Sequence, residues 1–240
     1  MKKLFAMTVA VLLLFSVLLG IPAAYGQAPE TGKTLDILFS HDTHSHLNTF
    51  TTVVEDEETD IGGFARANTL IKAQRAKDPD TLVIDGGDFS MGTLIQTVFE
   101  TQAAELRMLG YMGYDVTTFG NHEFDEGTAE LLRMQKGGCH PKDGCYFPKK
   151  KYKGADFKWL AANVVDSASG KTLFPATYVK KFGGVSVGFI GLTLKATPAV
   201  VTSTGVAGLS GALESGGSVH IYRLLCCSLL RGEVPRYEAA

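Results

Sequence analysis

The segment "DVTTFGNHEFDEGTAELLRMQK", from Asp115 to Lys136, decides the fold. After Asp115 come three β-branched residues and a phenylalanine, which predict a buried strand, and "GNHE" then forms a polar turn that contains glycine. The following residues predict a helix with acids in its first turn and bases in its last, as the helix dipole favours. A strand that runs through a polar turn into a helix is the repeating unit of a parallel sheet.

The same unit occurs twice upstream. Residues 34–42, "TLDILFSHD", and 81–88, "TLVIDGGD", are predicted strands that end in polar residues, and residues 62–78 and 97–113 are predicted helices. Downstream, residues 157–165 predict another strand, and residues 176–193 predict a hairpin around Gly183-Gly184. This alternation predicts an α/β fold with a largely parallel sheet, in which polar residues at three strand ends meet in one crevice.

The composition supports a globular protein and argues against one class of partner. Of the 240 residues, 45% are hydrophobic and 20% are charged, which leaves enough apolar material for a sizeable core. The net charge of −2 offers no basic field for a polyanion, so no nucleic acid polymer is expected as a partner.

The N-terminus reads as a secretory signal peptide. Met1-Lys2-Lys3 is a positive start, residues 4–21 are almost entirely apolar, and small residues at Ala24 and Gly26 suit cleavage before Gln27. An uncleaved membrane anchor is the alternative, because the apolar run is near the length that spans a bilayer. The signal-peptide interpretation predicts export to the periplasm or the extracellular space, no stable membrane span after cleavage, and conditions that permit disulfides.

Cys139 and Cys145 flank the short polar loop "CHPKDGC". A local disulfide that closes this loop is the favoured interpretation. A zinc site that uses both cysteines and His140 is the alternative, although three such ligands are fewer than a structural zinc site needs.

The first polar cluster, "HDTHSHL", carries Asp42 and His44 two residues apart. On an extended segment both side chains would point the same way, and a carboxylate oxygen with an imidazole nitrogen suits zinc or manganese. An Asp-x-His pair occurs more often without a metal than with one, so this pair alone does not define a site. His41 and His46 are interpreted as neighbours rather than ligands.

The second cluster, "DGGDFSMGT", places Asp88 after two glycines at a strand end. A carboxylate there can bridge two cations, because glycine lets the backbone approach closely. The alternative is an aspartate that caps the following turn. Asp85, nearer the strand, is interpreted as structural.

The third cluster is "GNHEFDEG". Asn121 offers a carbonyl oxygen to a cation, His122 could give a proton to a phosphoryl oxygen, and Asp125 could hold that imidazole charged and oriented. The alternative is a turn before a helix, with Asp125 as the N-cap residue.

Taken in order, "ILFSHDTHSHL", "DGGDFSMGT" and "GNHEFDEG" resemble the three N-terminal blocks of the calcineurin-like metallophosphoesterases. Within that class the chain is similar to the secreted 5'-nucleotidases, which include periplasmic UDP-sugar hydrolases. "AANVV" and "VGFIGLTLKATP" resemble the downstream strands, so the resemblance runs from about Leu35 to Leu209. It implies an α/β sandwich of sheets flanked by helices.

The resemblance also implies a chemistry. By it, the chain hydrolyses phosphoric esters of nucleotides or UDP-sugars with water activated by two divalent metal ions, zinc, manganese or similar. It implies that Asp42 and His44 bind one metal, that Asp88 bridges both, and that Asn121 binds the second. It gives His122 and Asp125 the role of a catalytic dyad.

The C-terminal part departs from the family pattern. The family has later histidine-containing blocks, one of them "GHxH"-like, but the single histidine after His140 is His220, in "SGGSVHIYRLLCC", which resembles neither block. The predicted organisation is a signal peptide (1–26), the N-terminal part of a metallophosphoesterase domain (27–210) and an atypical tail (211–240) from a frameshift or truncation. The alternative function is therefore a domain incomplete at its C-terminus, a weak or inactive remnant that binds at most one metal.

Overall fold

The computed structural model describes residues 35–145, 151–182, 185–210 and 225–227, and for 225–227 the backbone alone. These ranges belong to one compact unit, Leu35–Ala240. The predicted signal peptide (1–26) lies outside the described residues, and so does the predicted tail (211–240), apart from residues 225–227. Among the described residues, no helix combines the length and the apolar character needed to cross a membrane.

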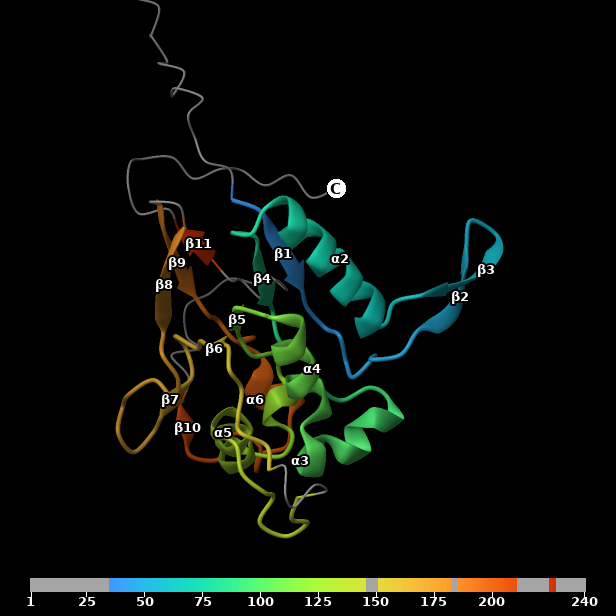
Figure 1. Ribbon diagram of the computed structural model, residues 1–240. Helices are drawn as coiled ribbons and strands as arrows, with labels where there is room; N and C mark the ends of the chain where they lie inside the picture. The colour runs from blue at the N-terminus through green and yellow to red at the C-terminus, as the bar shows by residue number, and fades with distance from the viewer. Residues whose placement is uncertain (1–34, 146–150, 183–184, 211–224, 228–240) are drawn as a thin grey trace, which may run out of the picture. The chain divides into compact units, whose positions relative to one another are not determined.

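The central element is a parallel sheet of four strands (Figure 1). Its order is β1 (Ile37–Ser40), β4 (Leu82–Asp85), β5 (Val116–Thr117) and β6 (Lys158–Trp159). Each strand lies within a segment that the sequence predicted as a strand. The predicted α/β fold with a parallel sheet is therefore confirmed, although β5 and β6 are shorter than predicted.

A second sheet packs on the first. The predicted hairpin is present as β8 (Thr177–Phe182) and β9 (Val185–Ile190), which pair antiparallel, and its tip at residues 183–184 lies outside the described residues. The backbone of β11 (Leu225–Cys227) pairs antiparallel with the end of β9.

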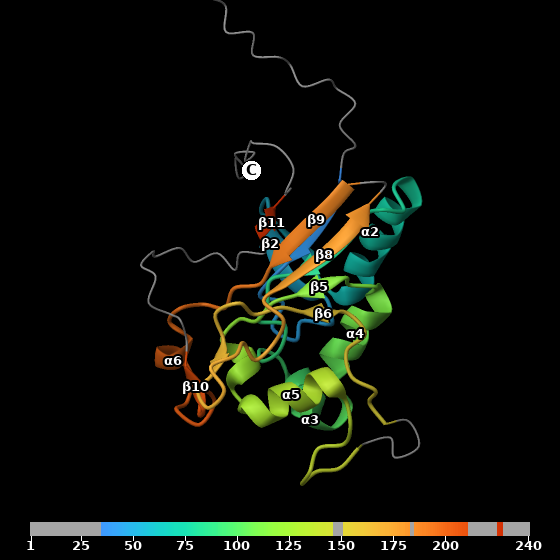
Figure 2. The same cartoon turned by 90° about the vertical axis from the view of Figure 1, so that its left-hand side faces the viewer.

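The side chains of β4 explain the layering, because they alternate between two cores. Leu82 and Ile84 pack with Val187 and Phe189 of β9. Val83 points the other way, into a larger core that includes residues from the helices. The parallel sheet therefore lies between the β8–β9 sheet and α2, as Figures 1 and 2 show.

Three helices supply most of the helical residues of this larger core. They are α2 (Phe64–Lys77), α4 (Ala104–Met112) and α5 (Thr128–Lys136), each inside a predicted helical segment. The helix predicted over residues 97–113 is not continuous, and that prediction is wrong. The segment forms η1 (Leu94–Val98), α3 (Phe99–Gln102) and α4, with a break at Ala103, which has a φ of 49°. Phe99 and Leu106, on either side of the break, are both buried in the same core.

The sequence did not predict the hairpin of β2 (Phe50–Val54) and β3 (Glu57–Ile61), which joins β1 to α2 (Figure 1). Glu55 and Asp56 form its turn with φ of 51° and 67°, the sign that a tight hairpin turn requires. Nearly all its residues are exposed, so no alternation of apolar and polar residues marked it.

The remaining described elements are short. They are η2 (His122–Phe124), β7 (Val165–Asp166), α6 (Thr197–Val200) and β10 (Leu209–Ser210), and β7 pairs with β10.

Candidate metal centre

The loops that follow β1 and β4 are hydrogen-bonded to each other at the carboxyl end of the sheet. The Asp42 N–H donates to the Gly87 carbonyl (2.9 Å), and the His44 N–H donates to the Asp88 carbonyl (3.0 Å). Asp42, His44 and Asp88 have φ of 51°, 42° and 51°, a left-handed conformation that is unusual outside glycine and collects at functional sites. The predicted convergence of strand-end loops is therefore present here.

Asp42, His44 and Asp88 form a compact set of donors. One ligand atom of each lies within 4.8 Å of the others, and His44 Nε2 is 3.5 Å from Asp42 Oδ1. His44 Nδ1 is 2.8 Å from the Met91 carbonyl. A carbonyl can only accept, so Nδ1 carries a proton and Nε2 is the nitrogen left to bind a metal, which is how a metal-binding histidine is usually held.

Carboxylate oxygens with an imidazole nitrogen suit zinc or manganese, so these residues fit a divalent ion. The extended segment that the sequence predicted at Asp42 and His44 is wrong, however. Asp42 and His44 do not lie on an extended strand, and it is their left-handed backbone that brings the two side chains together.

Glu123 is the residue of this site to which the sequence assigned no role. Its buried carboxylate accepts three main-chain N–H groups, from Asp88 (2.8 Å), Phe89 (3.0 Å) and Gly120 (2.8 Å). It therefore ties the loop after β4 to the loop after β5. Burial, followed by the negative charge of Asp88, raises the pKa of Glu123 well above its ordinary value. The one feature of the sequence that could have indicated this role is that Glu123 stands beside the apolar Phe124, in a segment that forms a short helical turn.

Gly120 shows how closely these two loops approach. A Cβ atom at this position would lie 2.2 Å from Asp88 Cγ, so no larger residue fits. Asn121 follows directly, and the next N–H, that of His122, donates to Asp88 Oδ1 (2.8 Å). The main chain thus places Asn121 between two residues that contact Asp88.

His122 and Asp125 are in direct contact. His122 Nδ1 is 2.6 Å from Asp125 Oδ2, and 37% and 26% of the two side chains are exposed, so a solute can reach them. The His122 ring lies 5.1 Å from that of His44, edge to face. Asp125 does not cap α5, because Gly127 holds the N-cap position, so that alternative is wrong.

Asp85, by contrast, points into the protein. Its buried carboxylate accepts from Ser40 Oγ (2.7 Å), the Gly87 N–H (2.9 Å) and Thr117 Oγ1 (3.2 Å). Burial raises the pKa of Asp85 to about 6, against the opposing effect of these hydrogen bonds. Its role is to hold the end of β4 in place, as the sequence suggested.

Cys139 and Cys145 are joined by a disulfide, so neither sulfur is available as a thiolate ligand. His140, inside the loop, lies with Glu100 and Asp143 rather than with the two sulfur atoms.

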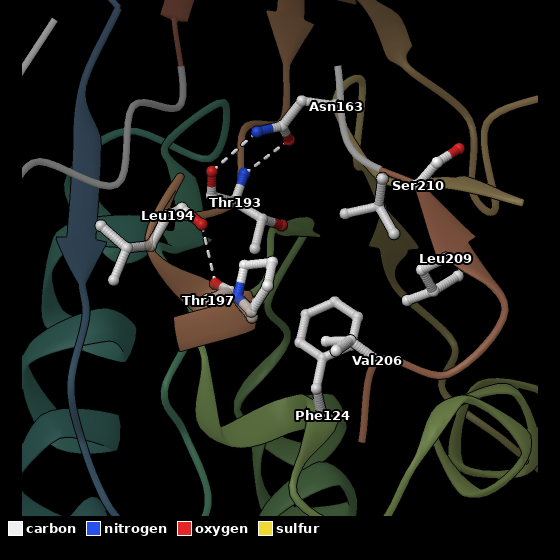
Figure 3. Close-up of a pocket in the computed structure, with 10 residues that line it drawn as sticks. Phe124, Asn163, Thr193, Leu194, Thr197, Val206, Leu209 and Ser210 are labelled. Atoms are coloured by element: carbon white, nitrogen blue, oxygen red, sulfur yellow. Dashed lines mark hydrogen bonds between the residues drawn. The ribbon is translucent and has the colours of Figure 1, made fainter. Parts of the chain in front are cut away.

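A pocket of about 70 Å³ lies beside η2 (Figure 3). Phe124, Val206 and Leu209 give it an apolar lining. The Asn163 side chain is hydrogen-bonded to the main chain of Thr193, donating through Nδ2 (2.8 Å) and accepting at Oδ1 (2.9 Å). These contacts fix the segment after β9 against the segment after β6.

The fold and the donor set together define a class of protein. The calcineurin-like phosphoesterase family matches this chain over residues 36–196. The chain belongs to that family and is, by family, a phosphoesterase. The expected metallophosphoesterase fold, with sheets flanked by helices, is therefore confirmed.

Individual relatives include nucleotidases. The chain is 31% identical over 183 residues to endonuclease YhcR of Bacillus subtilis, and the aligned region covers 75% of this chain and 15% of that protein. It is 30% identical over 195 residues to the 5'-nucleotidase of Mus musculus, covering 75% and 30% of the two chains. The crystal structure of a 5'-nucleotidase precursor from Thermus thermophilus superposes with a TM-score of 0.60 at 29% identity, covering 74% of this chain and 31% of that one. The chain thus spans less than a third of each of these three proteins.

Proposed function

We propose that this chain is a metal-dependent phosphoric ester hydrolase that acts on nucleotides or UDP-sugars. The observation that carries the proposal is the meeting of two groups of residues at one end of the sheet. Asp42, His44 and Asp88 form a donor set, and Asp88 accepts the main-chain N–H of His122, whose ring contacts Asp125. The family match and the nucleotidase relatives support the same reading.

Asp42 and His44 would hold one divalent ion, Asp88 would bridge to a second, and Asn121 would bind the second. Such a pair of ions supplies an activated water and neutralises the charge of the phosphoryl oxygens. Glu123 would support the binding of both ions indirectly, because it fixes the loops that carry Asp88 and Asn121.

His122 and Asp125 would act on the phosphoryl group. Asp125 accepts from His122 Nδ1, which orients the ring. The remaining ring nitrogen, Nε2, can then donate a proton to a phosphoryl or leaving-group oxygen. The partial exposure of both side chains gives a substrate access to this nitrogen.

Substrate size separates two candidate activities. The relative named as an endonuclease favours a polymer, whereas the nucleotidase relatives favour a small nucleotide. The net charge of −2 gives no general attraction for a polyanion, so we infer the small substrate.

The second candidate function is a remnant that binds at most one metal and is weak or inactive as a catalyst. The observation behind it is the small donor set. Among the described residues, one His/Asp group is found at this edge of the sheet, and it has three members. These three residues and Asn121 are too few ligands for two cations, so several waters would have to complete the two coordination shells.

The test is hydrolysis by the chain from Gln27 to Ala240 with added Mn²⁺ or Zn²⁺. AMP, UDP-glucose and single-stranded DNA are compared, with His122→Ala as the catalytic variant and His46→Ala as the matched control. Metal-dependent turnover of AMP or UDP-glucose that His122→Ala abolishes supports the hydrolase. Preference for DNA supports the endonuclease reading, and metal binding without turnover supports the remnant.

We also infer that the chain is exported and that residues 1–26 are removed. The relative from Thermus thermophilus is named as a precursor, which agrees with a processed N-terminus in the family. N-terminal sequencing of the protein recovered from the periplasm or medium tests this, and a first residue of Gln27 is expected.

A further inference from the structure

A second group of metal-ligand side chains lies outside the catalytic loops. Glu100 comes from α3, and His140 and Asp143 come from the loop that the disulfide closes, which we call the disulfide loop (residues 139–145). One donor atom of each lies within 4.8 Å of the others. None of these residues belongs to the loops that carry Asp42, His44 and Asp88.

The disulfide loop is held in shape by its own bonds. Besides the disulfide, the His140 N–H donates to the Gly144 carbonyl (3.1 Å), and the Gly144 N–H donates to the His140 carbonyl (2.9 Å). The residues between them, including Asp143, are therefore confined to a tight turn next to His140.

Arg133 of α5 fixes the disulfide loop against α3. Its Nη1 donates to the Gly138 carbonyl (2.8 Å) and its Nη2 donates to the Glu100 carbonyl (2.7 Å). One guanidinium thus sets the distance between the main chain of Glu100 and the start of the disulfide loop. Groups positioned in advance lose little conformational freedom when they bind a ligand.

The geometry of the His140 ring suits an ion on one side. Nδ1 is 2.7 Å from Asp143 Oδ2, a carboxylate oxygen that can only accept, so Asp143 holds this side of the ring. Nε2 faces Glu100 Oε1 at 3.8 Å, which is too long for a hydrogen bond. Two donors that each lie about 2.0–2.2 Å from one ion can be this far apart. The spacing resembles the 3.5 Å between His44 Nε2 and Asp42 Oδ1 in the catalytic site.

Charge and exposure also suit a cation. Burial, followed by the negative charge of Glu100, raises the pKa of the neighbouring Glu126, so the surroundings of Glu100 favour positive charge. His140 is only 12% exposed, whereas 34% of Glu100 and 54% of Asp143 are accessible, so an ion can enter from solvent and meet a nearly buried imidazole.

We propose that Glu100 and His140, through Oε1 and Nε2, bind a divalent ion of the zinc class at a site separate from the catalytic one, with Asp143 holding the imidazole from its Nδ1 side. An imidazole nitrogen with a carboxylate oxygen, completed by water, suits zinc or manganese better than calcium, which takes six to eight oxygen ligands. The bound ion would join the disulfide loop to α3. The competing role for the same residues is a pair of salt bridges to a protonated His140, which needs no metal.

The experiment removes the catalytic donors first, so that the outcome does not depend on the proposed function. The chain from Gln27 to Ala240 with Asp42→Asn and His44→Asn is the parent, because asparagine tolerates the left-handed backbone at both positions. Zinc binding is measured by equilibrium dialysis with metal analysis, and the zinc-dependent rise in Tm is measured in parallel.

The parent is expected to bind one zinc ion per chain. Adding Glu100→Gln or His140→Ala should weaken that binding by about tenfold or more, since even an outer partner of a metal ligand is worth about 10–100-fold. The rise in Tm should disappear in the same variants, while His46→Ala should change neither result. Glu100→Gln keeps the shape of the side chain, so it serves if His140→Ala does not fold. A parent that binds no zinc, or variants that bind it as tightly as the parent, would overturn the proposal.

Discussion

Glu123→Gln tests whether one buried carboxylate holds the loops after β4 and β5 together. The substitution keeps the size of the side chain and replaces one acceptor oxygen by an NH₂ group. In the structure Oε2 accepts two N–H groups, from Asp88 and Gly120, and Oε1 accepts one, from Phe89. Whichever way the amide turns, at least one buried N–H group loses its acceptor and faces another donor.

The magnitude follows from the number of N–H groups left without a partner. Each one costs about 1–3 kcal/mol when it is buried. Glutamine in its better orientation leaves one N–H group without an acceptor, so we expect Glu123→Gln to lower the free energy of unfolding by about 1–3 kcal/mol. Glu123→Ala leaves three N–H groups without an acceptor, so it should lower the free energy of unfolding more than twice as much. That is a large share of the total stability of a domain, about 5–15 kcal/mol.

Urea denaturation of the chain from Gln27 to Ala240 measures this free energy. Glu58→Gln is the matched control, because Glu58 is exposed on β3 and the same chemical change there should stay within about 0.5 kcal/mol. If Glu123→Gln costs no more than Glu58→Gln, the carboxylate does not tie the loops and the reasoning fails. A stability loss without any loss of metal affinity would separate the folding role of Glu123 from its proposed role in positioning Asp88.

Three further predictions concern other parts of the chain. His122→Ala should lower kcat about 10²–10⁴-fold with little change in Tm, as expected for a proton donor, and His46→Ala should leave kcat unchanged. Burial raises the pKa of Asp85 from 3.8 to about 6, so the stability that this group contributes is full below about pH 4 and is lost as the pH rises through 6. Between pH 4 and pH 7, the free energy of unfolding measured in urea should therefore fall by up to about 3 kcal/mol less in Asp85→Asn than in the parent. Replacing Cys139 and Cys145 together by serine should cost about 2 kcal/mol, since the disulfide closes a short loop, and equal urea midpoints for the two proteins would contradict this.

The sequence predicted the sheet because its signals were local. Buried runs such as residues 82–85 end in polar residues, and parallel strands bring those ends together. The position of Asp42, His44 and Asp88 near one another follows from that order of strands. What could not be predicted is the backbone that brings the side chains into contact, because the left-handed turns at Asp42 and His44 depend on hydrogen bonds to residues more than forty positions away.

The other differences have the same origin. The break at Ala103 depends on a shared core that the helical pattern of residues 97–113 does not encode. The role of Glu123 could not be predicted, because its partners lie in two loops that are distant in sequence from each other. Glu100 and His140 are forty residues apart, and they meet because Arg133 bonds the carbonyls of Glu100 and of Gly138, which directly precedes the disulfide loop.

The most direct test of the central claim is release of inorganic phosphate from AMP by the chain from Gln27 to Ala240 as Mn²⁺ is added. We predict release that rises with the metal and falls by about a hundredfold or more in His44→Asn, which lacks the imidazole donor while tolerating the left-handed backbone. Release that is independent of added metal, or equal in the parent and His44→Asn, would contradict the claim that this donor set holds the catalytic ion.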